Sequence, residues 1–256
     1  MNLERIKLPL SVNPFSDNII LLAELELFSQ LPFDCLSPEE LIRADTIASP
    51  SAKQFYLNSR VLLRTFLAKF LDVTPSSLLL QYQPSGKPEL VGHSLQFNVS
   101  HSHQWIGFAF SKHCIGLDLE WTVHQQRNYQ AIARRFFAAP EIDFLSRFDQ
   151  SELETQFFKL WTQKEAALKA HGGGIKTGLE KLDFVSKTHS INRKTYHVEH
   201  AQSVDNLHIA VATEQAQTET EFKNISSFFY ILTPTLEIYP YQPPYKQNIS
   251  LIPESL

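Results

Sequence analysis

The chain has 256 residues, 43% of them hydrophobic, which is enough apolar surface to close a substantial core. Lys and Arg number 23 against 27 for Asp and Glu, and a formal net charge of -4 argues against general nucleic-acid binding. Two cysteines exclude a disulfide scaffold, and the sequence has no signal-peptide pattern and no apolar run of the roughly 20 residues that cross a membrane, so we expect a cytoplasmic protein.

The first strong element in chain order is a helix predicted over residues 52–71, where aromatic residues and leucines recur at helical spacing. Lys53, Arg60 and Arg64 share one face of this helix, and they belong to a locally basic stretch from Arg43 to Lys87. A basic face of this kind attracts phosphate groups. An ordinary solvated helix face explains the same spacing, and the spacing alone favours that simpler interpretation.

Three short strands are predicted next, over residues 95–99, 105–110 and 115–120, with the last two joined as a hairpin. In the third strand Asp118 and Glu120 point to one face, about 7 Å apart along the backbone, while the apolar residues point to the other. A second helix is predicted to begin at Ser151, with Glu154 completing a capping box, and to end at the glycines that start with Gly172.

Three acids in these elements are candidate metal ligands. Asp118 and Glu120 on the strand, with Glu165 on the second helix, offer the oxygen ligands that Mg²⁺ prefers. Acids on an exposed surface are the commoner explanation of the same pattern. Lys169 lies one helical turn after Glu165, where a surface salt bridge is the ordinary interpretation.

His101 follows the first of the three strands, where it could bind phosphate or serve as a hydrogen-bonding turn residue. The sequence has no nucleophile elbow around Ser100 or Ser102, no Walker phosphate loop and no dinucleotide-binding fingerprint, so these site classes are excluded.

Taken together, four segments resemble the signature motifs of the Sfp-type 4′-phosphopantetheinyl transferases. They are GKP (86–88), FNVSHS (97–102), IGLDLE (115–120) and WTQKEAALKAHGGG (161–174). The resemblance covers about residues 43–174, and the alanine at position 166 is typical of the W/KEA branch of the family.

The resemblance implies an α/β (α+β) fold of two similar, pseudo-symmetric halves, residues 1–115 and 116–256, with the active site at their interface. It implies a Mg²⁺-dependent enzyme that transfers the 4′-phosphopantetheine arm of coenzyme A to a serine of an apo acyl or peptidyl carrier protein, releasing 3′,5′-ADP. Such enzymes serve fatty acid, polyketide or nonribosomal peptide synthesis. The resemblance also suggests a monomer, and it leaves the carrier and the pathway open.

Carried onto this sequence, the resemblance makes Asp118, Glu120 and Glu165 the metal ligands and Glu165 and Lys169 the catalytic residues. With the basic helix face, the coenzyme-binding candidates are Lys53, Arg60, Arg64, Lys87, Ser100, His101, Lys164, Gly172 and Gly174. Residues 132–137 offer basic and apolar surface for an acidic carrier. Two departures from the family pattern, Trp121 after the acids and few basic residues around Arg43, predict a looser grip on the coenzyme phosphates.

Two other functions fit the sequence. One is a protein that binds coenzyme A or a carrier without turnover, which the presence of all three acids and Lys169 disfavours. The other is a different Mg²⁺-dependent phosphate enzyme, such as a hydrolase of nucleotide pyrophosphates, which would release its product without any carrier.

Overall fold

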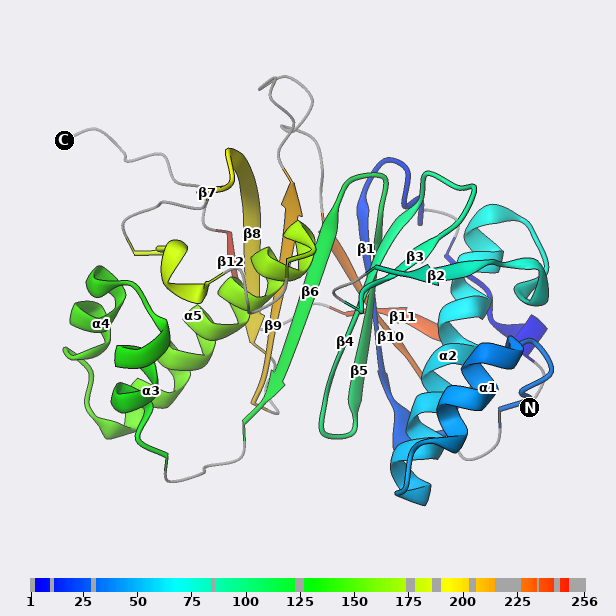
Figure 1. The fold of residues 1–256 in the computed structure, drawn as a ribbon, viewed down its shortest axis with the longest axis horizontal. Helices are drawn as coiled ribbons and strands as arrows, with labels where there is room; N and C mark the ends of the chain where they lie inside the picture. Colours follow the sequence, from blue (N-terminus) through cyan, green and yellow to red (C-terminus); the bar gives the residue numbers. More distant parts are fainter. Residues whose placement is uncertain are drawn as a thin grey trace.

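The structure is a computed structural model of the chain. It describes residues 3–9, 12–28, 31–83, 86–122, 127–173, 178–185, 190–202, 206–214, 227–233, 235–241 and 245–248. Two lobes lie side by side in Figure 1, each made of a sheet with helices on its outer face. The mixed α/β, two-lobed architecture that the sequence predicted is confirmed.

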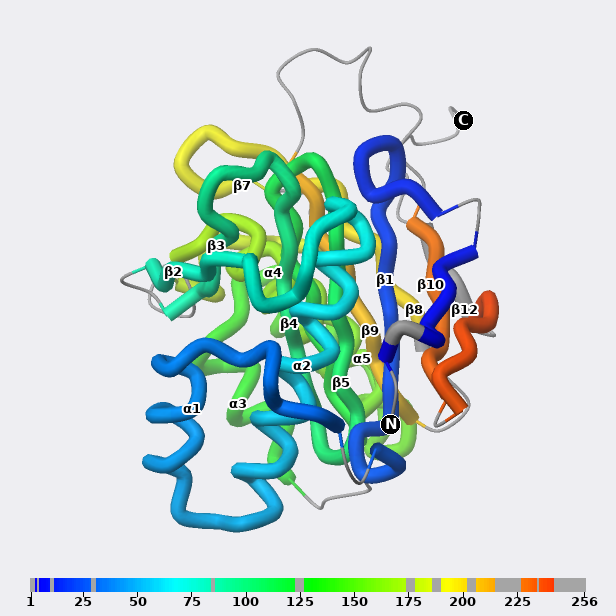
Figure 2. The backbone as a smooth tube through the Cα atoms, turned by 90° about the vertical axis from the view of Figure 1, so that its right-hand side faces the viewer, coloured from blue at the N-terminus to red at the C-terminus, as the bar shows by residue number. Residues whose placement is uncertain are grey.

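The first lobe contains a five-stranded sheet in the order β11-β10-β1-β5-β4. Its strands are β1 (Asn18–Glu24), β4 (Gln96–Ser102), β5 (Trp105–Ser111), β10 (Ser227–Leu232) and β11 (Ile238–Pro240), with a separate pair, β2 (Leu80–Tyr82) and β3 (Pro88–Leu90). Its helices are α1 (Pro38–Asp45) and α2 (Pro50–Leu71), with short 3-10 turns η1 (Leu3–Arg5), η2 (Leu25–Leu27) and η3 (Pro75–Ser77). Figure 2 looks onto this lobe and shows β10 running beside β1, to which it pairs in parallel.

The second lobe contains a sheet in the order β12-β8-β9-β6, with β7 paired to β8. Its strands are β6 (Ile115–Trp121), β7 (Ser190–Ile191), β8 (Lys194–Gln202), β9 (Leu207–Glu214) and β12 (Tyr245–Asn248). Its helices are α3 (Tyr129–Phe136), α4 (Ala139–Leu145) and α5 (Gln150–His171), followed by the 3-10 turn η5 (Leu179–Lys181).

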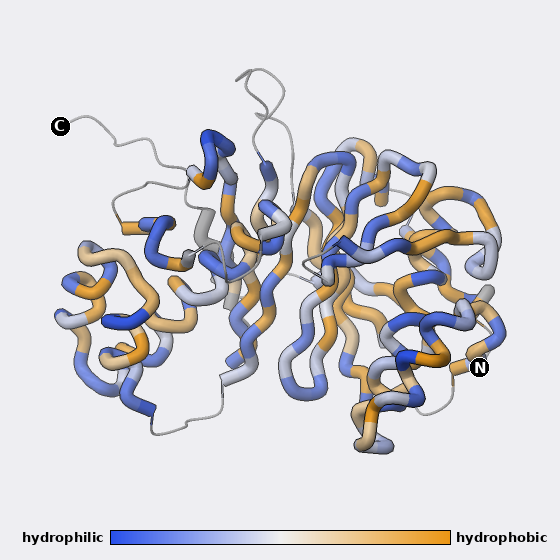
Figure 3. The backbone as a smooth tube through the Cα atoms, viewed as in Figure 1, coloured by the Kyte–Doolittle hydropathy of each residue, from blue (hydrophilic) through white to orange (hydrophobic). Residues whose placement is uncertain are grey.

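Three hydrophobic cores hold these layers together. One lies between α2 and the first sheet, one between α5 and the second sheet, and a third joins the facing sides of the two sheets. Apolar residues accordingly colour much of the central strands of the first lobe in Figure 3. Side chains alternate along β6, so Leu117 and Leu119 pack in the third core while Asp118 and Glu120 face α5.

The two predicted helices form, with one correction at a terminus. Helix α2 begins after Ser49, whose side chain accepts a hydrogen bond from the backbone N–H of Ala52. Helix α5 begins after Asp149, which accepts from the N–H groups of Ser151 and Glu152, so the predicted capping box at Ser151 is wrong. An aspartate caps the helix two residues earlier. Gly172 ends α5 with a left-handed φ of 84°, as predicted.

The predicted hairpin of β5 and β6 is also wrong. The two strands belong to different sheets: β5 lies between β1 and β4, and β6 pairs with β9. Strand β1 is buried from Asn18 to Ala23, which suits a central position with a neighbour on each side. It pairs with β5 in the place where β6 was expected.

Strands β10 and β11, from the end of the chain, complete the first lobe's sheet by pairing next to β1. The division of the chain into halves at residues 115 and 116 stays a prediction. Within the described segments, no helix combines the length and the apolar character needed to cross a membrane.

Candidate active site

The centre of the molecule is the contact between β6 and α5, and Gly116 makes that contact close. A Cβ atom at this position would lie 2.0 Å from the backbone oxygen of Ala166 and 2.4 Å from the backbone nitrogen of Ala170. The helix backbone therefore rests directly on the strand. The close approach brings Glu165 and Lys169 of α5 over the strand face that carries Asp118.

Lys169 connects residues from three segments of the chain. Its Nζ lies 2.6 Å from Oδ1 of Asp118 and donates a hydrogen bond to Oγ of Ser100 over 2.9 Å. The hydroxyl of Ser100 in turn donates to Oδ1 of Asp118 over 3.3 Å. A helix lysine, a strand aspartate and a serine of the other lobe thus meet at one point, as the resemblance implied for the active-site interface.

The three acids are crowded together electrostatically. Burial, together with the nearby Asp118 carboxylate, raises the pKa of Glu120 and of Glu165 to about 7. Burial also raises the pKa of Asp118, against the opposing effect of Lys169. A site that makes carboxylates reluctant to ionise is one in which an added cation or a proton is stabilising.

Glu120 is held from two sides. Its Oε1 accepts a hydrogen bond from the indole Nε1 of Trp161 over 3.2 Å, and its Oε2 accepts from the hydroxyl of Ser102 over 3.4 Å. Trp161 also packs against the core of the second lobe, where its ring stacks on Phe157 at 5.7 Å between centroids. Sequence reasoning missed its second role, because nothing in a helical repeat shows where the indole N–H points.

Two oxygens of these acids test whether a divalent metal would fit. Oδ2 of Asp118 and Oε1 of Glu165 are buried and have no hydrogen-bond partner, a costly arrangement that a hard cation would relieve. Together with Glu120 they form the oxygen donor set that Mg²⁺ prefers. Among the described residues no three acidic, histidine or cysteine side chains stand together as a preformed metal site, so the fit rests on these two oxygens and on the chemistry of the donors.

A cavity of about 240 Å³ lies beside Lys169. Its lining comes from three of the four motifs noted in the sequence: Gly86, Lys87, Pro88, Asn98, Val99, Lys169 and Gly172. The ammonium of Lys87 donates to the backbone oxygens of Lys169 over 2.9 Å and of Ile115 over 3.3 Å, which fastens the end of α5 and the start of β6 to the β2–β3 turn. Gly174, the last coenzyme-binding candidate, lies outside the described residues.

His101 stands at the edge of the site. It is exposed at the surface, its ring meets Phe55 edge-on at 5.4 Å, and it contributes to a second cavity of about 700 Å³ that Phe55, Tyr56 and His103 also line. Desolvation of the ring and the nearby Lys169 ammonium lower the pKa of His101, with Asp118 acting in the opposite sense. The ring is therefore within electrostatic reach of the Lys169 cluster.

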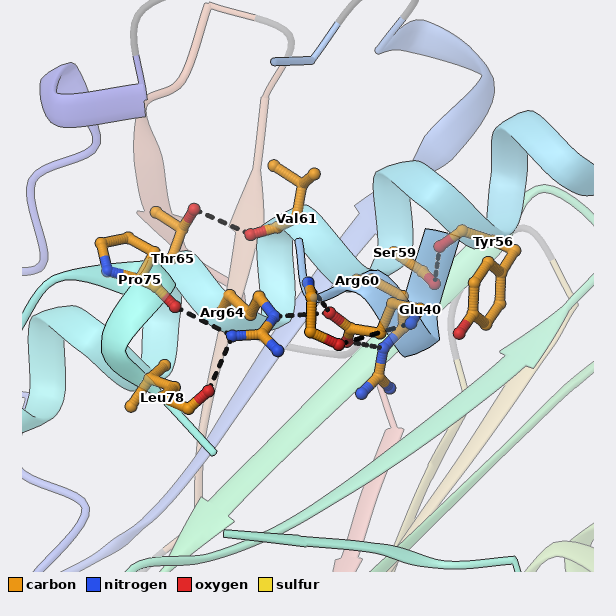
Figure 4. Close-up of polar contacts among 10 residues, drawn as sticks. Glu40, Tyr56, Ser59, Arg60, Val61, Arg64, Thr65, Pro75 and Leu78 are labelled. Carbon is orange, nitrogen blue, oxygen red and sulfur yellow. Dashed lines mark hydrogen bonds and ion pairs between the residues drawn. The ribbon is translucent and has the colours of Figure 1, made fainter. Parts of the chain in front are cut away.

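The basic face of α2 is largely neutralised (Figure 4). Glu40 of α1 accepts from Nε of Arg60 over 2.8 Å and from Nε of Arg64 over 2.7 Å, with all three side chains buried. Arg64 also donates to the backbone oxygens of Pro75 and Leu78. The basic stretch predicted from the sequence begins at Arg43, three residues after Glu40, so it does not include this acid. A signal was present, because Ser37 and Glu40 form a capping box that can be recognised in the sequence.

Two other lysines predicted to bind the coenzyme are placed elsewhere. Lys53 is paired with Asp45 over 2.7 Å on the exposed surface. Lys164 is fully buried, paired with Glu141 over 2.6 Å, and its ammonium also donates to the backbone oxygens of Leu179 and Leu182. Because no surface of Lys164 remains for a ligand, we leave it out of the proposed site, and we leave out Arg64 for the same reason.

A third cavity, of about 200 Å³, is lined in part by Glu120. Aromatic rings dominate its lining, which comprises Glu120, Trp121, Thr122, Arg127, Tyr129, Ile132, Phe157, Phe158 and Trp161. Ile132 belongs to the segment that the sequence offered for carrier docking. Glu120 therefore lines an aromatic cavity, while Lys169 lines the cavity of the glycine and lysine motifs.

Two family models match the chain in succession. The model described as 4′-phosphopantetheinyl transferase, N-terminal, matches residues 27–113, and that described as the 4′-phosphopantetheinyl transferase superfamily matches residues 114–217. The boundary between the two matches falls between β5 and β6, where the chain passes from the first lobe to the second.

Several curated proteins are similar in sequence. A putative 4′-phosphopantetheinyl transferase of Synechocystis sp. is 40% identical over 152 residues, which are 57% of this chain and 61% of the relative. The 4′-phosphopantetheinyl transferase HetI of Nostoc sp. is 34% identical over 58% of this chain and 64% of its own. The 4′-phosphopantetheinyl transferase Sfp of Bacillus subtilis is 31% identical over 57% of this chain and 70% of its own. The chain thus spans less than two thirds of the length of the first two relatives.

Proposed function

The chain belongs to the 4′-phosphopantetheinyl transferase superfamily, and from this membership we propose that it transfers the 4′-phosphopantetheine arm of coenzyme A to a serine of an apo carrier protein, releasing 3′,5′-ADP. The observation that carries the proposal is the contact of Lys169 with Asp118 and Ser100. It joins three of the signature segments, from both lobes, around carboxylates that the sequence alone could not place together.

The proposed reaction breaks one bond and forms another at a single phosphorus atom. The carrier serine oxygen attacks the phosphorus that bears the pantetheine, and the bond to the oxygen of the departing 3′,5′-ADP breaks. The serine proton needs an acceptor. Glu165 suits this role because its pKa of about 7 lets its carboxylate take a proton near neutral pH.

Lys169 would neutralise charge that builds on the phosphate oxygens as the bond to 3′,5′-ADP breaks. Asp118, Glu120 and Glu165 are the residues that would hold Mg²⁺. When bound, the ion supplies a Lewis acid that neutralises charge on the coenzyme pyrophosphate. Glu165 has two carboxylate oxygens, so one residue can contact the ion and still accept a proton.

The remaining candidates divide between the two substrates. We assign Lys87, Ser100 and Gly172 to the coenzyme side, since Lys87 and Gly172 line the cavity beside Lys169 and Ser100 contacts Lys169. We also assign His101 to the coenzyme side, because its ring is within electrostatic reach of Lys169. We assign the aromatic cavity that Glu120 lines to the pantetheine arm and the arriving carrier. The resemblance further suggests a monomer. The cytoplasmic location expected from the sequence and the assignment to the W/KEA branch stay predictions.

The proposal is tested by incubating the purified chain with coenzyme A, Mg²⁺ and a panel of apo carriers from fatty acid, polyketide and peptide synthesis, followed by intact-protein mass spectrometry. We expect at least one carrier to gain the mass of phosphopantetheine, and a chelator to prevent the gain. Absence of any gain across the panel, with coenzyme A bound tightly in calorimetry, would instead identify a binding protein. Release of a nucleotide without a carrier would identify a hydrolase.

A further inference from the structure

The two sheets meet edge to edge along β4 and β6, and side chains bridge the junction. Asn98, Ser100 and Ser102 alternate along β4 on the face opposite Phe97, so all three point toward β6. Their side-chain oxygens accept hydrogen bonds from the backbone N–H groups of Leu117, Leu119 and Trp121 over 2.9, 3.1 and 2.9 Å. We call these three hydrogen bonds the polar seam.

The polar seam provides hydrogen-bond partners for backbone groups that the edge of a sheet leaves unpaired. The N–H groups of Leu117, Leu119 and Trp121 point away from β9, on the open side of β6, and would lack partners in the interior. A neighbouring backbone would normally supply carbonyl oxygens to them. Here serine and asparagine oxygens do so, and unlike a carbonyl a serine hydroxyl still has a proton to donate.

The hydrogen bonds that each serine hydroxyl accepts determine where its own proton points. Ser100 accepts from the N–H of Leu119 and from the ammonium of Lys169, which occupies both of its lone pairs. Its hydroxyl proton goes to Asp118. Ser102 accepts from the N–H of Trp121, and its proton goes to Oε2 of Glu120.

The contacts from the serines to the acids are long, at 3.3 and 3.4 Å, against about 2.7–2.8 Å for an optimal hydroxyl bond. These hydrogen bonds orient the carboxylates but bind them only weakly. The serines can orient them because the hydrogen bonds from the backbone N–H groups hold the two serine Oγ atoms in place. Glu120 is then confined between Ser102 on one oxygen and the Trp161 indole on the other.

We infer that Ser102 is a positioning residue for Glu120 and Ser100 for Asp118, so that the polar seam that joins the lobes also orients the acids. This inference rests on the proposed function, in which Asp118 and Glu120 hold the metal ion. Partners of metal ligands typically change metal affinity by about 10-fold or more when they are removed.

Ser102 gives the cleaner test, because Ser100 also contacts Lys169. The variant Ser102→Ala removes both hydrogen bonds, Ser102→Thr restores a hydroxyl, and Ser102→Cys keeps the shape with only a weak donor. Ser111→Ala is the matched control: its hydroxyl is buried and accepts a backbone hydrogen bond from His113, at a site where it contacts none of the three acids.

Calorimetric titration of the coenzyme-free variants with Mn²⁺, alongside thermal unfolding, reads the effect without catalysis. We expect Ser102→Ala and Ser102→Cys to bind Mn²⁺ about 10-fold more weakly, with Ser102→Thr close to wild type and Ser111→Ala unchanged. Wild-type Mn²⁺ affinity in both Ser102→Ala and Ser102→Cys, or an equal loss in Ser111→Ala, overturns the inference. A wild-type chain that modifies no carrier, while its Mn²⁺ affinity still depends on Ser102, overturns the proposed function alone.

Discussion

His200 and His208 face each other on β8 and β9, inside the second lobe. Their ring nitrogens are 3.3 Å apart and both residues are buried. Burial lowers the pKa of His208 to about 4 and, with His208 and Lys159 nearby, lowers the pKa of His200 well below its usual value. The folded protein therefore keeps both rings neutral at pH values where the unfolded chain would protonate them.

Stability should consequently fall in mild acid. The unfolded state binds more protons between about pH 6.5 and about 4, so the free energy of unfolding decreases as the pH drops through this window. The free energy of unfolding changes by about 1.4 kcal/mol per pH unit for one histidine that is neutral in the folded state and protonated in the unfolded state. We therefore expect His208 alone to lower the free energy of unfolding by on the order of 2 kcal/mol between pH 7 and pH 5.

Urea unfolding at several pH values measures this dependence. His208→Phe should flatten the pH profile, whereas His93→Phe, which alters an exposed histidine, should keep the wild-type slope. An unfolding free energy that holds constant or rises toward pH 5 in the wild type would contradict the expectation.

Asp118, Glu165 and Lys169 were predicted as site residues from their order along the chain. In the structure Lys169 pairs with Asp118, and both act electrostatically on Glu165. Their roles in metal binding and catalysis stay predictions. Glu40 was missed because its two arginine partners lie 20 and 24 residues away. Charged residues that pair over such a distance leave no local pattern in the sequence. A basic helix face predicted from spacing can therefore belong to a buried ion pair instead of an exposed binding surface.

At the scale of elements, the strand β6 and the helix α5 work as one unit through Gly116. The neighbours that would obstruct a side chain there are backbone atoms of α5, which can yield only if the whole helix shifts. Gly107 on β5 offers a comparison. A Cβ there would lie 2.8 Å from Cδ2 of Leu117 and 3.0 Å from Cδ1 of Leu119, the ends of flexible side chains.

Gly116→Ala should therefore displace Glu165 and Lys169 from Asp118. We expect the transfer rate to fall about 100-fold, since a displacement of about 1 Å can have that effect, and stability to fall by about 1–3 kcal/mol. Gly107→Ala should lose much less activity. The measurement is initial transfer rate together with chemical unfolding, and equal activities of the two variants would refute the role given to Gly116.

Element types were predictable while element partners were not. Both long helices and the three central strands follow from periodicity, and Gly172 marks a real helix end. The predicted hairpin of β5 and β6 does not form, because β5 pairs with β1 instead. Strand β1 lies more than 80 residues earlier in the chain, so a local sequence pattern does not reveal this pairing. The start of α5 failed for a local reason: Asp149 and Glu152 fit a capping pattern as well as Ser151 and Glu154 do.

At the scale of the whole molecule, the two lobes are tied together in three ways. The third core packs the sheets against each other, the polar seam joins β4 to β6, and Lys87 fastens the β2–β3 turn to the end of α5. The candidate site residues lie along this junction, with Ser100 on the first lobe and Asp118, Glu165 and Lys169 on the second. Strands β10 and β11 return to the first sheet, which they extend beside β1.

The central proposal is that phosphopantetheine transfer takes place at the junction between the two lobes. The most direct measurement is the single-turnover rate of phosphopantetheine transfer to a carrier by the wild type, by Glu165→Gln and by Glu152→Gln, an exposed acid on the same helix. We predict that Glu165→Gln transfers at least about 100-fold more slowly with unchanged thermal unfolding, and that Glu152→Gln keeps the wild-type rate. A wild-type rate in a folded Glu165→Gln variant would contradict the account.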